Sequence, residues 1–279
     1  MPQITFKSLA YTDIQTLLKC FNESFKKYYL PQQLTKEQFA DKLYAEAIDL
    51  KLSFGAFDNN SLVAFILNGI DTLNNKTLAY NAGTGVLPEY RGRRLSFSLY
   101  EYCLSCLKNS GIEKCVLEVI DRNFVAIKTY ERNGFTSTRK LISYIGIAEC
   151  DKTSTIDIKA NIQPDWDIVD EMCEWERSWQ YNNNTLKRSW DNYSMITAFS
   201  GDGAEAFCIA NLKNGRVGNF GSKNKNTKYL APLFAYLGQN TKSPLTIINV
   251  DEMAVTSNSF ITSIGLEVFY AACTMEKDL

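Results

Sequence analysis

Three arginines lie close together in the segment Gly85–Tyr102, GVLPEYRGRRLSFSLYEY. The segment begins like a strand, turns at Pro88, and continues with the apolar spacing of a helix. The turn before this helix carries Arg91, Arg93 and Arg94. A helix N-terminus presents unpaired amide groups and the positive end of the helix dipole, and both attract anions. The arrangement therefore predicts a phosphate-binding site.

The loop matches neither of the two commonest phosphate motifs. The chain contains no G-x-x-x-x-G-K-[ST] sequence, and the loop has no G-x-G-x-x-G. Gly92 lets the backbone approach a ligand closely, because glycine has no Cβ. We therefore expect backbone amides to bind the phosphate and the arginines to add positive charge.

The pattern around this loop resembles the GCN5-related N-acetyltransferases, the GNAT family. The matching pieces occur in the family's order and at its spacing, and they are Val86-Leu-Pro88-Glu-Tyr-Arg91-Gly92, Leu117-Glu-Val119, Asn123, and Ala126-Ile-Lys-Thr-Tyr130-Glu-Arg-Asn-Gly134-Phe135. The resemblance covers about Ile4–Ala148. It implies an α/β fold with a mixed, splayed sheet flanked by helices, and it implies acetyl-CoA as the cofactor.

The resemblance also implies how the cofactor is held. The Val86 strand would run beside the pantetheine arm, the loop amides would hold the pyrophosphate, and the charged loop side chains would meet the 3′-phosphate. The implied cofactor-binding residues are Val86, Leu87, Pro88, Arg91, Gly92, Arg93, Arg94, Leu95, Ser96, Asn123 and Tyr130.

Two positions depart from the family pattern. The chain has Arg94 and Ser96 where the family carries small residues, glycine first and then glycine or alanine. Either the site is degraded, or both positions are already helical, where any residue supplies its N–H. Serine suits the start of a helix and Arg94 keeps the positive charge, so we expect a working site.

The resemblance implies that Tyr130 is the general acid that protonates the departing thiolate. The alternative is a core aromatic residue on a short helix. Asn123 resembles the residue that hydrogen-bonds the cofactor arm, and it also suits the N-cap of the helix that follows.

Glu118 is our candidate general base, because it lies on the expected central strand. It is otherwise a charged residue at a strand end. Asp121, Glu89 and Glu23 are weaker candidates.

Composition excludes other chemistries. The 279 residues include no histidine, which removes His-based triads and the commonest general base. Cys103 and Cys106 have C-x-x-C spacing, but both fall on the apolar face of a predicted helix and no second pair has ligand spacing, so we expect no metal. A net charge of −1 argues against a nucleic-acid partner.

The chain shows no apolar signal run at its start and no stretch long enough to span a membrane. Eight cysteines are spread through apparent core segments. We therefore expect a cytoplasmic protein with reduced thiols and no membrane partner, as a monomer or a homodimer.

The expected elements recur in the same order in both halves. The first half contains a hairpin, strand, helix, apolar strand, short helix and strand, at Leu52–Gly69, Lys76–Leu87, 95–110, Lys114–Ile120, Phe124–Asn133 and Phe135–Ala148. The second half repeats this order over Tyr193–Ala210, Arg216–Phe220, Tyr229–Leu237, Leu245–Val250, Ser257–Ser263 and Leu266–Met275, after a Trp-rich helix at Asp165–Tyr181. We predict two tandem GNAT-like domains, residues 1–150 and 151–279, that join near the polar stretch Cys150–Gln163.

The second half lacks the signature. Ile261 stands where Tyr130 stands, Ala254 stands roughly where Asn123 does, and the loop Gly221–Lys228 has no Pro-x-x-Arg-Gly. We expect a degenerate domain that shapes the acceptor site or an interface. Four tryptophans either line a substrate groove or fill the core, and their spacing favours the core: Trp166, Trp175, Trp179 and Trp190.

These observations predict an acyltransferase that moves acetyl from acetyl-CoA to a primary amine of a small molecule or peptide. The amine would attack the thioester directly, with Tyr130 as general acid. The alternative is a non-catalytic acyl-CoA-binding or interaction module, suggested by the missing glycines and the unidentified base.

Overall fold

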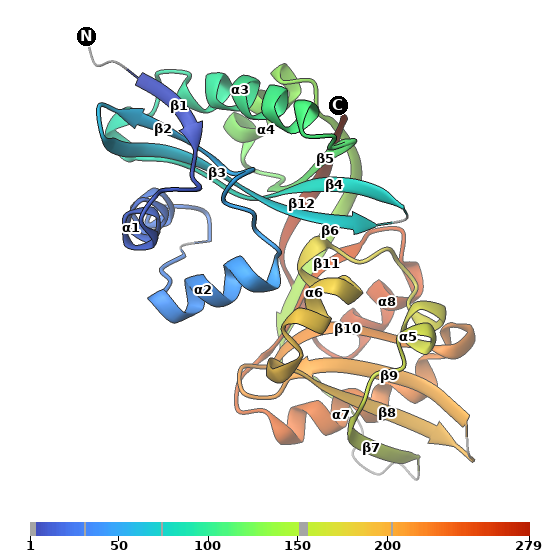
Figure 1. Cartoon of the computed structure of the whole chain (residues 1–279). Coiled ribbons are helices and arrows are strands. Elements are labelled where there is room, and N and C mark those ends of the chain that lie inside the picture. The colour runs from blue at the N-terminus through green and yellow to red at the C-terminus, as the bar shows by residue number, and fades with distance from the viewer. Residues whose placement is uncertain (1–3, 31, 74, 151–155, 202) are drawn as a thin grey trace. The chain divides into compact units, whose positions relative to one another are not determined.

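The computed structural model describes residues 4–30, 32–73, 75–150, 156–201 and 203–279. The chain divides into two compact units (Figure 1). Unit 1 comprises residues 1–138 and 273–279, and unit 2 comprises residues 139–272. The boundary predicted at residue 150 separates the two sequence repeats, which is a different division from that into compact units, and it stays a prediction.

Unit 1 is a mixed sheet with helices on both faces. Its strands are β1 (Ile4–Ser8), β2 (Phe54–Asp58), β3 (Ser61–Leu73), β4 (Lys76–Val86), β5 (Lys114–Ile120), the start of β6 (Thr136–Gly146) and the end of β12 (Glu267–Asp278). Its helices are α1 (Ile14–Phe25), α2 (Lys36–Ala45), α3 (Leu95–Asn109) and α4 (Phe124–Arg132). The order β1-β2-β3-β4-β5 is antiparallel up to β4, and β5 runs parallel to β4.

The sheet opens between β4 and β5. The two strands pair only from Leu78 with Lys114 to Asn81 with Leu117. Just beyond, β4 bulges against β3, because Leu67 pairs with Gly83 while Asn68 pairs with Asn81. The ends of β4 and β5 therefore diverge, which leaves a gap in the sheet next to the loop that follows β4.

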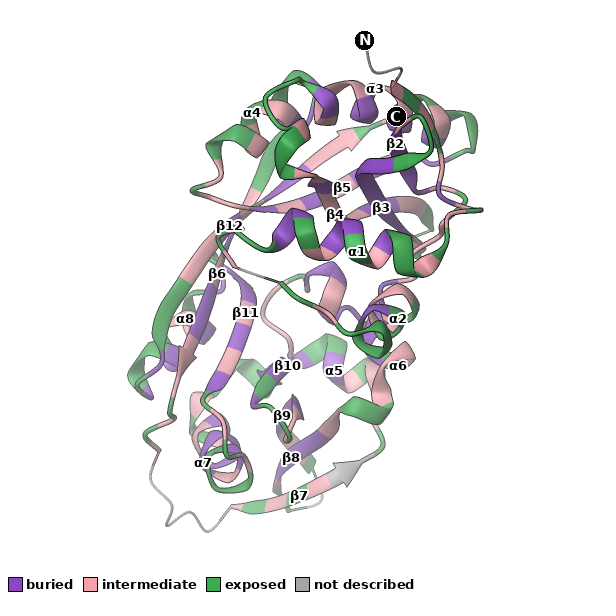
Figure 2. Ribbon diagram, turned by 90° about the vertical axis from the view of Figure 1, so that its left-hand side faces the viewer, coloured by how far each residue is buried: buried purple, intermediate pink, exposed green. Residues whose placement is uncertain are grey.

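Two hydrophobic clusters fix the helices on the two faces of this sheet (Figures 1 and 2). Leu99, Cys103 and Leu107 of α3 pack with Leu117 of β5 on one face. On the other face, Phe21 of α1 packs with buried residues of β2 and β3 and with Leu9, which follows β1. The helical apolar spacing predicted for the segment after the arginine loop is confirmed by the burial of α3.

Local capping agrees with the sequence. Asp13 caps α1 by accepting a hydrogen bond from the Thr16 amide, and Thr35 with Gln38 forms a complete capping box at α2. The start of α3, in contrast, has no side-chain cap.

Unit 2 repeats the layout of unit 1. Its strands are the rest of β6, β7 (Asp157–Ile162), β8 (Ser194–Ser200), β9 (Gly203–Asn211), β10 (Arg216–Ser222), β11 (Leu245–Asp251) and the start of β12. Its helices are α5 (Trp166–Met172), α6 (Asn183–Arg188), α7 (Leu230–Asn240) and α8 (Val255–Ser263). The strand order β7-β8-β9-β10-β11 mirrors β1 to β5 and is followed by β6.

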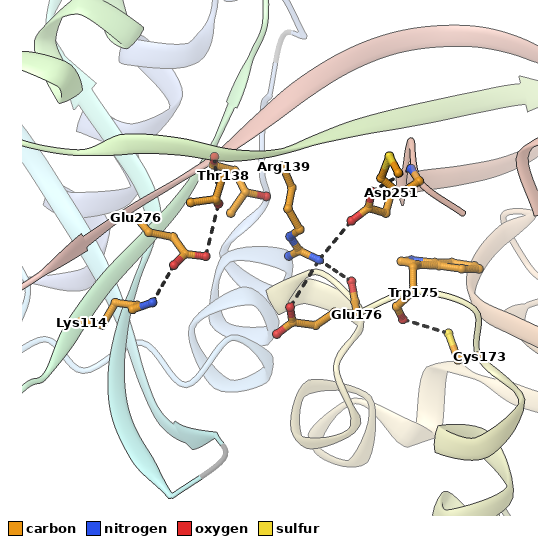
Figure 3. Close-up of polar contacts among 10 residues, drawn as sticks. Lys114, Thr138, Arg139, Cys173, Trp175, Glu176, Asp251 and Glu276 are labelled. Carbon is orange, nitrogen blue, oxygen red and sulfur yellow. Dashed lines mark hydrogen bonds and ion pairs between the residues drawn. The ribbon is translucent and has the colours of Figure 1, made fainter. Parts of the chain in front are cut away.

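The last strand of each repeat lies next to the fifth strand of the other repeat. β6 follows α4 in the chain but pairs with β11, from Gly146 with Leu245 to Leu141 with Asp251. The end of β12 follows β5 in the strand order of the sheet. Lys114 of β5 binds Glu276 at 2.6 Å, and Glu276 also accepts a hydrogen bond from Thr138 at 3.3 Å (Figure 3). The sequence repeat did not predict this exchange.

The mixed α/β fold and nearly all predicted elements are confirmed, with two corrections in unit 2. The predicted helix Asp165–Tyr181 ends at Met172, and Cys173 is extended. The polar stretch Cys150–Gln163, predicted as a junction, contains strand β7, while residues 151–155 lie outside the described residues. Tertiary contacts of the segment after Met172, described below, override its helical spacing.

Candidate active site

A cavity of about 550 Å³ lies in unit 1 where β4 and β5 diverge. Its wall is formed by the end of α1 with the loop after it, the end of β4, the arginine loop, and the first two turns of α3 and of α4. Residues far apart in the sequence, such as Ser24, Val86 and Tyr130, meet at this wall. The splayed sheet therefore opens onto the predicted phosphate loop.

The loop reaches α3 through two left-handed residues. Gly92 has a φ of 76° and Arg94 a φ of 57°, whereas Arg93 between them has no positive φ. Ser96 lies in α3, as predicted, but the prediction that Arg94 is already helical was wrong. Arg94 is the N-cap, and the chain must turn there with a positive φ that glycine adopts at no steric cost. An arginine in this conformation costs about 1–3 kcal/mol in folding.

The first turn of α3 leaves amide groups for a ligand. Ser98 is the first helical residue whose amide bonds back, to the carbonyl of Arg94 at 3.2 Å. The amides of Leu95, Ser96 and Phe97 precede it and have no partner within the helix. Alternating φ signs in the preceding loop give a concave run of amides of the kind that binds anions.

Two of the three arginine side chains hold the loop itself. Arg91 donates to the carbonyls of Val86 at 3.1 Å and Ser24 at 2.7 Å. Arg93 donates to the carbonyl of Glu89 at 2.9 Å and stacks on Tyr90. The side chain of Arg94 lines the cavity and makes no hydrogen bond or ion pair with the described residues.

Tyr130 lies at the cavity wall and in the core at once. It is buried, with 8% of its surface exposed, and it packs with Tyr100 and Phe135. Burial raises the pKa of Tyr130 to about 12 and the nearby Tyr28 adds to the rise, while hydrogen bonds from Thr84, Tyr100 and Asn81 oppose it. The hydroxyl is therefore protonated at neutral pH and is available as a proton donor.

Sequence reasoning missed the residues around this hydroxyl. Thr84 and Tyr100 line the cavity with Tyr130, and Asn81 binds both of them. Asn81 and Thr84 interrupt the otherwise apolar and glycine-rich run Leu78–Val86, which was the available signal.

Asn123 is fully engaged within the protein. Its side-chain oxygen accepts the Ala126 amide at 3.2 Å, which confirms the predicted N-cap. Its amide donates to the Tyr28 hydroxyl at 3.1 Å. The neighbouring Tyr29 donates to the carbonyl of Arg122 at 3.2 Å, so the loop after α1 is tied to the start of α4.

Glu118 does not line the cavity. On β5 it alternates with Leu117 and Val119, whose side chains enter the same core as Tyr130. Glu118 accepts a hydrogen bond from Tyr80 at 3.3 Å. Of the predicted cofactor residues, Leu87, Pro88 and Arg93 also lie outside the wall, and the others line it together: Val86, Arg91, Gly92, Arg94, Leu95, Ser96, Asn123 and Tyr130.

The corresponding gap in unit 2 is filled by the chain itself. β10 and β11 pair only at Arg216 with Thr246 and Val217 with Ile247. A Cβ at Gly221 of β10 would overlap with the carbonyl oxygen of Met172. The segment that follows Met172 therefore lies directly against β10.

Contacts of the segment 173–176 hold it there. Cys173 donates to Asn219 at 3.2 Å. It also donates to the carbonyl of Trp175 at 3.3 Å, while Arg139 donates to the carbonyl of Glu176 at 2.8 Å (Figure 3). A cavity of only about 10 Å³ is left beside it.

The four tryptophans pack in or against the core of unit 2, which agrees with their spacing. Trp179 is buried, while the half-buried Trp175 packs on Phe220 and the half-buried Trp166 packs on Trp190. Ile261 and Ala254, at the positions of Tyr130 and Asn123, are buried as well.

Within the described residues, no group of three or more acidic or cysteine side chains is arranged to hold a metal ion. None of the helices in the same part of the chain is long and apolar enough to cross a membrane.

Comparisons with known proteins agree with this geometry. The sequence model of the Acetyltransferase (GNAT) family matches residues 14–135. A spermidine N(1)-acetyltransferase from Thermoplasma acidophilum is 26% identical over 145 residues, which cover 47% of this chain and 88% of that protein.

Solved structures extend the likeness to the whole chain. A putative acetyltransferase from Pyrococcus horikoshii matches with a TM-score of 0.71 and 13% identity, over 100% of this chain and 90% of that one. A tandem GNAT protein from the clavulanic acid biosynthesis pathway matches with a TM-score of 0.69 and 9% identity, over 99% and 98%. Residues 14–135 therefore form a domain of the Acetyltransferase (GNAT) family, and the whole chain has the fold of a tandem GNAT protein.

Proposed function

We propose that unit 1 transfers the acetyl group of acetyl-CoA to a primary amine, with Tyr130 as the general acid. One observation carries this proposal. The buried, protonated hydroxyl of Tyr130 and the unpaired amides of the first turn of α3 line the same 550 Å³ cavity. A phosphate site and a proton donor are thus present in one pocket.

The residues of the loop fit a pyrophosphate. Gly92 has open space around it, so a ligand can reach the backbone there. The amides of Leu95, Ser96 and Phe97 would bind the phosphate oxygens, and Arg94 would add a full positive charge. Because Arg94 is already left-handed in the structure, its conformational cost falls on folding and does not reduce affinity.

Bound acetyl-CoA supplies a thioester that reacts with an amine. The amine nitrogen forms a bond to the acyl carbon, the carbon–sulfur bond breaks, and the sulfur takes a proton. Tyr130 would give that proton and regain one from solvent. Asn81, Thr84 and Tyr100 surround its hydroxyl and stabilise the charge that it carries in between.

The amine must lose a proton before or during attack. Among the described residues, the cavity wall contains no Asp or Glu. We propose that the acceptor binds as the neutral amine, or that Glu118 takes the proton through water from outside the cavity wall. The rate should then rise with pH as the fraction of neutral amine increases.

The composition of the wall also bears on the acceptor. Lys27, Arg91 and Arg94 are the charged residues that line it in the described part of the chain. A polyamine keeps at least one further ammonium group after one amine is deprotonated, and that group needs a nearby anion. We therefore propose a primary amine without a second ammonium near the reacting nitrogen, in contrast to the spermidine named for the T. acidophilum relative.

Release of the CoA thiol, measured over a panel of amines, tests the proposal. Turnover with any primary amine supports it. Cofactor binding without turnover on every amine would instead support the non-catalytic acyl-CoA-binding module.

A further inference from the structure

Three side chains at the base of the cavity form a closed ring of hydrogen bonds. Asn81 and Thr84 come from β4, and Tyr100 comes from α3. The Asn81 amide donates to the Tyr100 hydroxyl, the hydroxyls of Tyr100 and Thr84 lie 3.0 Å apart, and the Thr84 hydroxyl lies 3.2 Å from the Asn81 oxygen. Tyr100 is 2% exposed, so water does not compete for these bonds.

The backbone fixes the orientation of the Asn81 side chain. The Gly83 amide donates to the side-chain oxygen of Asn81 at 3.0 Å, so the other end of that side chain is the donor to Tyr100. The Thr84 hydroxyl has one proton and can give it to the Asn81 oxygen or to Tyr100. When Thr84 donates to Tyr100, the Tyr100 hydroxyl accepts two bonds and its own proton is free for Tyr130.

Tyr130 lies next to these three hydrogen-bonded side chains. The centroid of its aromatic ring lies 5.4 Å from that of Tyr100, and the two ring planes meet at an angle of 77°. Thr84, Tyr100 and Tyr130 line the cavity together. Leu99, Cys103 and Phe135 belong to the same buried cluster as Tyr100 and Tyr130.

On the basis of the proposed function, we infer that Tyr100 is a positioning residue: held by Thr84 and Asn81, it orients the Tyr130 hydroxyl toward the cavity and donates a hydrogen bond to the phenolate that proton transfer creates. A buried phenolate without hydrogen-bond donors is unfavourable, because water no longer solvates its negative charge. Donors that are already in place stabilise that charge without reorganisation.

The groups that face Tyr130 agree with this role. The titratable side chains around it are Tyr28 from the loop after α1, Tyr100 and Cys103 from α3, and Cys115 from β5. Burial raises the pKa of both Cys103 and Cys115, so both thiols are neutral at physiological pH. Stabilisation of the phenolate then falls to the hydrogen-bond donors of the ring.

The test replaces the ring hydroxyls one at a time. Tyr100→Phe removes the donor to Tyr130, and Thr84→Val removes the hydroxyl that holds Tyr100, with little change of shape. Tyr102→Phe is the control, because Tyr102 is on the same helix but packs against Phe6 and Phe54, away from the cavity. For both ring variants we expect kcat to fall about tenfold or more and KM for acetyl-CoA to change less than about twofold.

A second measurement reports the pKa of residue 130 directly. Fluorotyrosine at position 130, titrated by ¹⁹F NMR, should show a higher pKa in the Tyr100→Phe and Thr84→Val backgrounds, since the donor to the phenolate is lost in the first and no longer held in place in the second. A pKa that stays unchanged or falls in both backgrounds overturns the inference, whatever the effect on kcat.

The two proposals fail differently. If Tyr130→Phe keeps full activity, the general-acid assignment is wrong. If Tyr130→Phe is impaired while both ring variants match the Tyr102→Phe control, the assignment stands and the role of the ring is refuted. Should Tyr100→Phe not fold, Thr84→Val alone decides between these outcomes.

Discussion

The carboxylate of Glu174 accepts hydrogen bonds from both the amide and the hydroxyl of Ser257, each at 2.7 Å. Ser257 lies in the first turn of α8, the helix of unit 2 that corresponds to α4. Lys225 pairs with the same carboxylate at 3.2 Å. The carboxylate of Glu174 is thus the anion bound at the start of α8 in unit 2. The segment after Met172, which carries Glu174, fills the gap beside β10.

We therefore predict one cofactor site per chain. Isothermal titration with CoA should give a stoichiometry of one, because the gap in unit 2 leaves about 10 Å³ and that in unit 1 about 550 Å³. Binding should be lost when Arg94 and the first turn of α3 are altered, and it should persist in Glu174→Gln. A stoichiometry of two would show that the segment after Met172 moves aside.

The same contact predicts a pH-dependent stability. Burial alone would raise the pKa of Glu174, but hydrogen bonds from Ser257, Lys225 and Thr256 lower it below its usual value. A carboxylate with a lowered pKa stabilises the fold above its unfolded pKa and loses that effect as the pH falls. Glu174→Gln should cost about 1–3 kcal/mol of unfolding free energy at pH 7 and much less near pH 3, as measured by urea denaturation. An equal loss at both pH values would contradict this assignment.

Two substitutions at Arg94 separate the effect of its charge from the effect of its backbone conformation. Arg94→Ala should weaken CoA binding, and the loss should shrink at high salt, because a phosphate contact is removed. Arg94→Gly removes the same charge but relieves the positive φ, so it should unfold at a higher denaturant concentration than Arg94→Ala. If both variants bind CoA as tightly as the wild type at low salt, the side chain does not contact the cofactor.

The pH profile of the reaction follows from Tyr130. With a pKa of about 12, the hydroxyl stays protonated through pH 10, whereas an ordinary tyrosine would be half ionised there. For an acceptor amine with a pKa below about 9, kcat should rise with pH to a plateau and show no fall before about pH 11. A falling limb near pH 9 to 10, with the fold intact by circular dichroism, would contradict the protonated acid.

Acceptor choice is tested with matched amines. Because no carboxylate lines the cavity within the described residues, spermidine should have a kcat/KM below that of an uncharged alkyl monoamine of similar length. Both are compared by thiol release at one pH and ionic strength. A clear preference for spermidine would mean that acidic residues outside the cavity wall bind the acceptor.

The features that could be predicted from sequence are local ones. Residues next to each other in the chain specify the strand, the arginine loop, α3 and the Asn123 cap, so their pattern is readable. The φ of Arg94 was missed because it depends on the path of the loop into α3 and not on the residue itself. A propensity argument placed it in the helix, one residue too early.

The missed features depend on contacts distant in the sequence. α5 ends at Met172 because Glu174 binds Ser257, 83 residues away, and the helical spacing of the tryptophans cannot show this. The hydrogen-bonded ring next to Tyr130 joins β4 to α3. The exchange of β6 and β12 depends on strand pairing between the repeats. Such pairings have no signature in a single sequence.

The most direct test of the central claim is the kcat of Tyr130→Phe from pH 7 to 10, with Tyr102→Phe as the control. The general-acid assignment predicts a fall of about 100-fold or more at every pH, with CoA affinity within about twofold of the wild type. A kcat equal to that of the control across this range would show that the departing sulfur takes its proton from elsewhere.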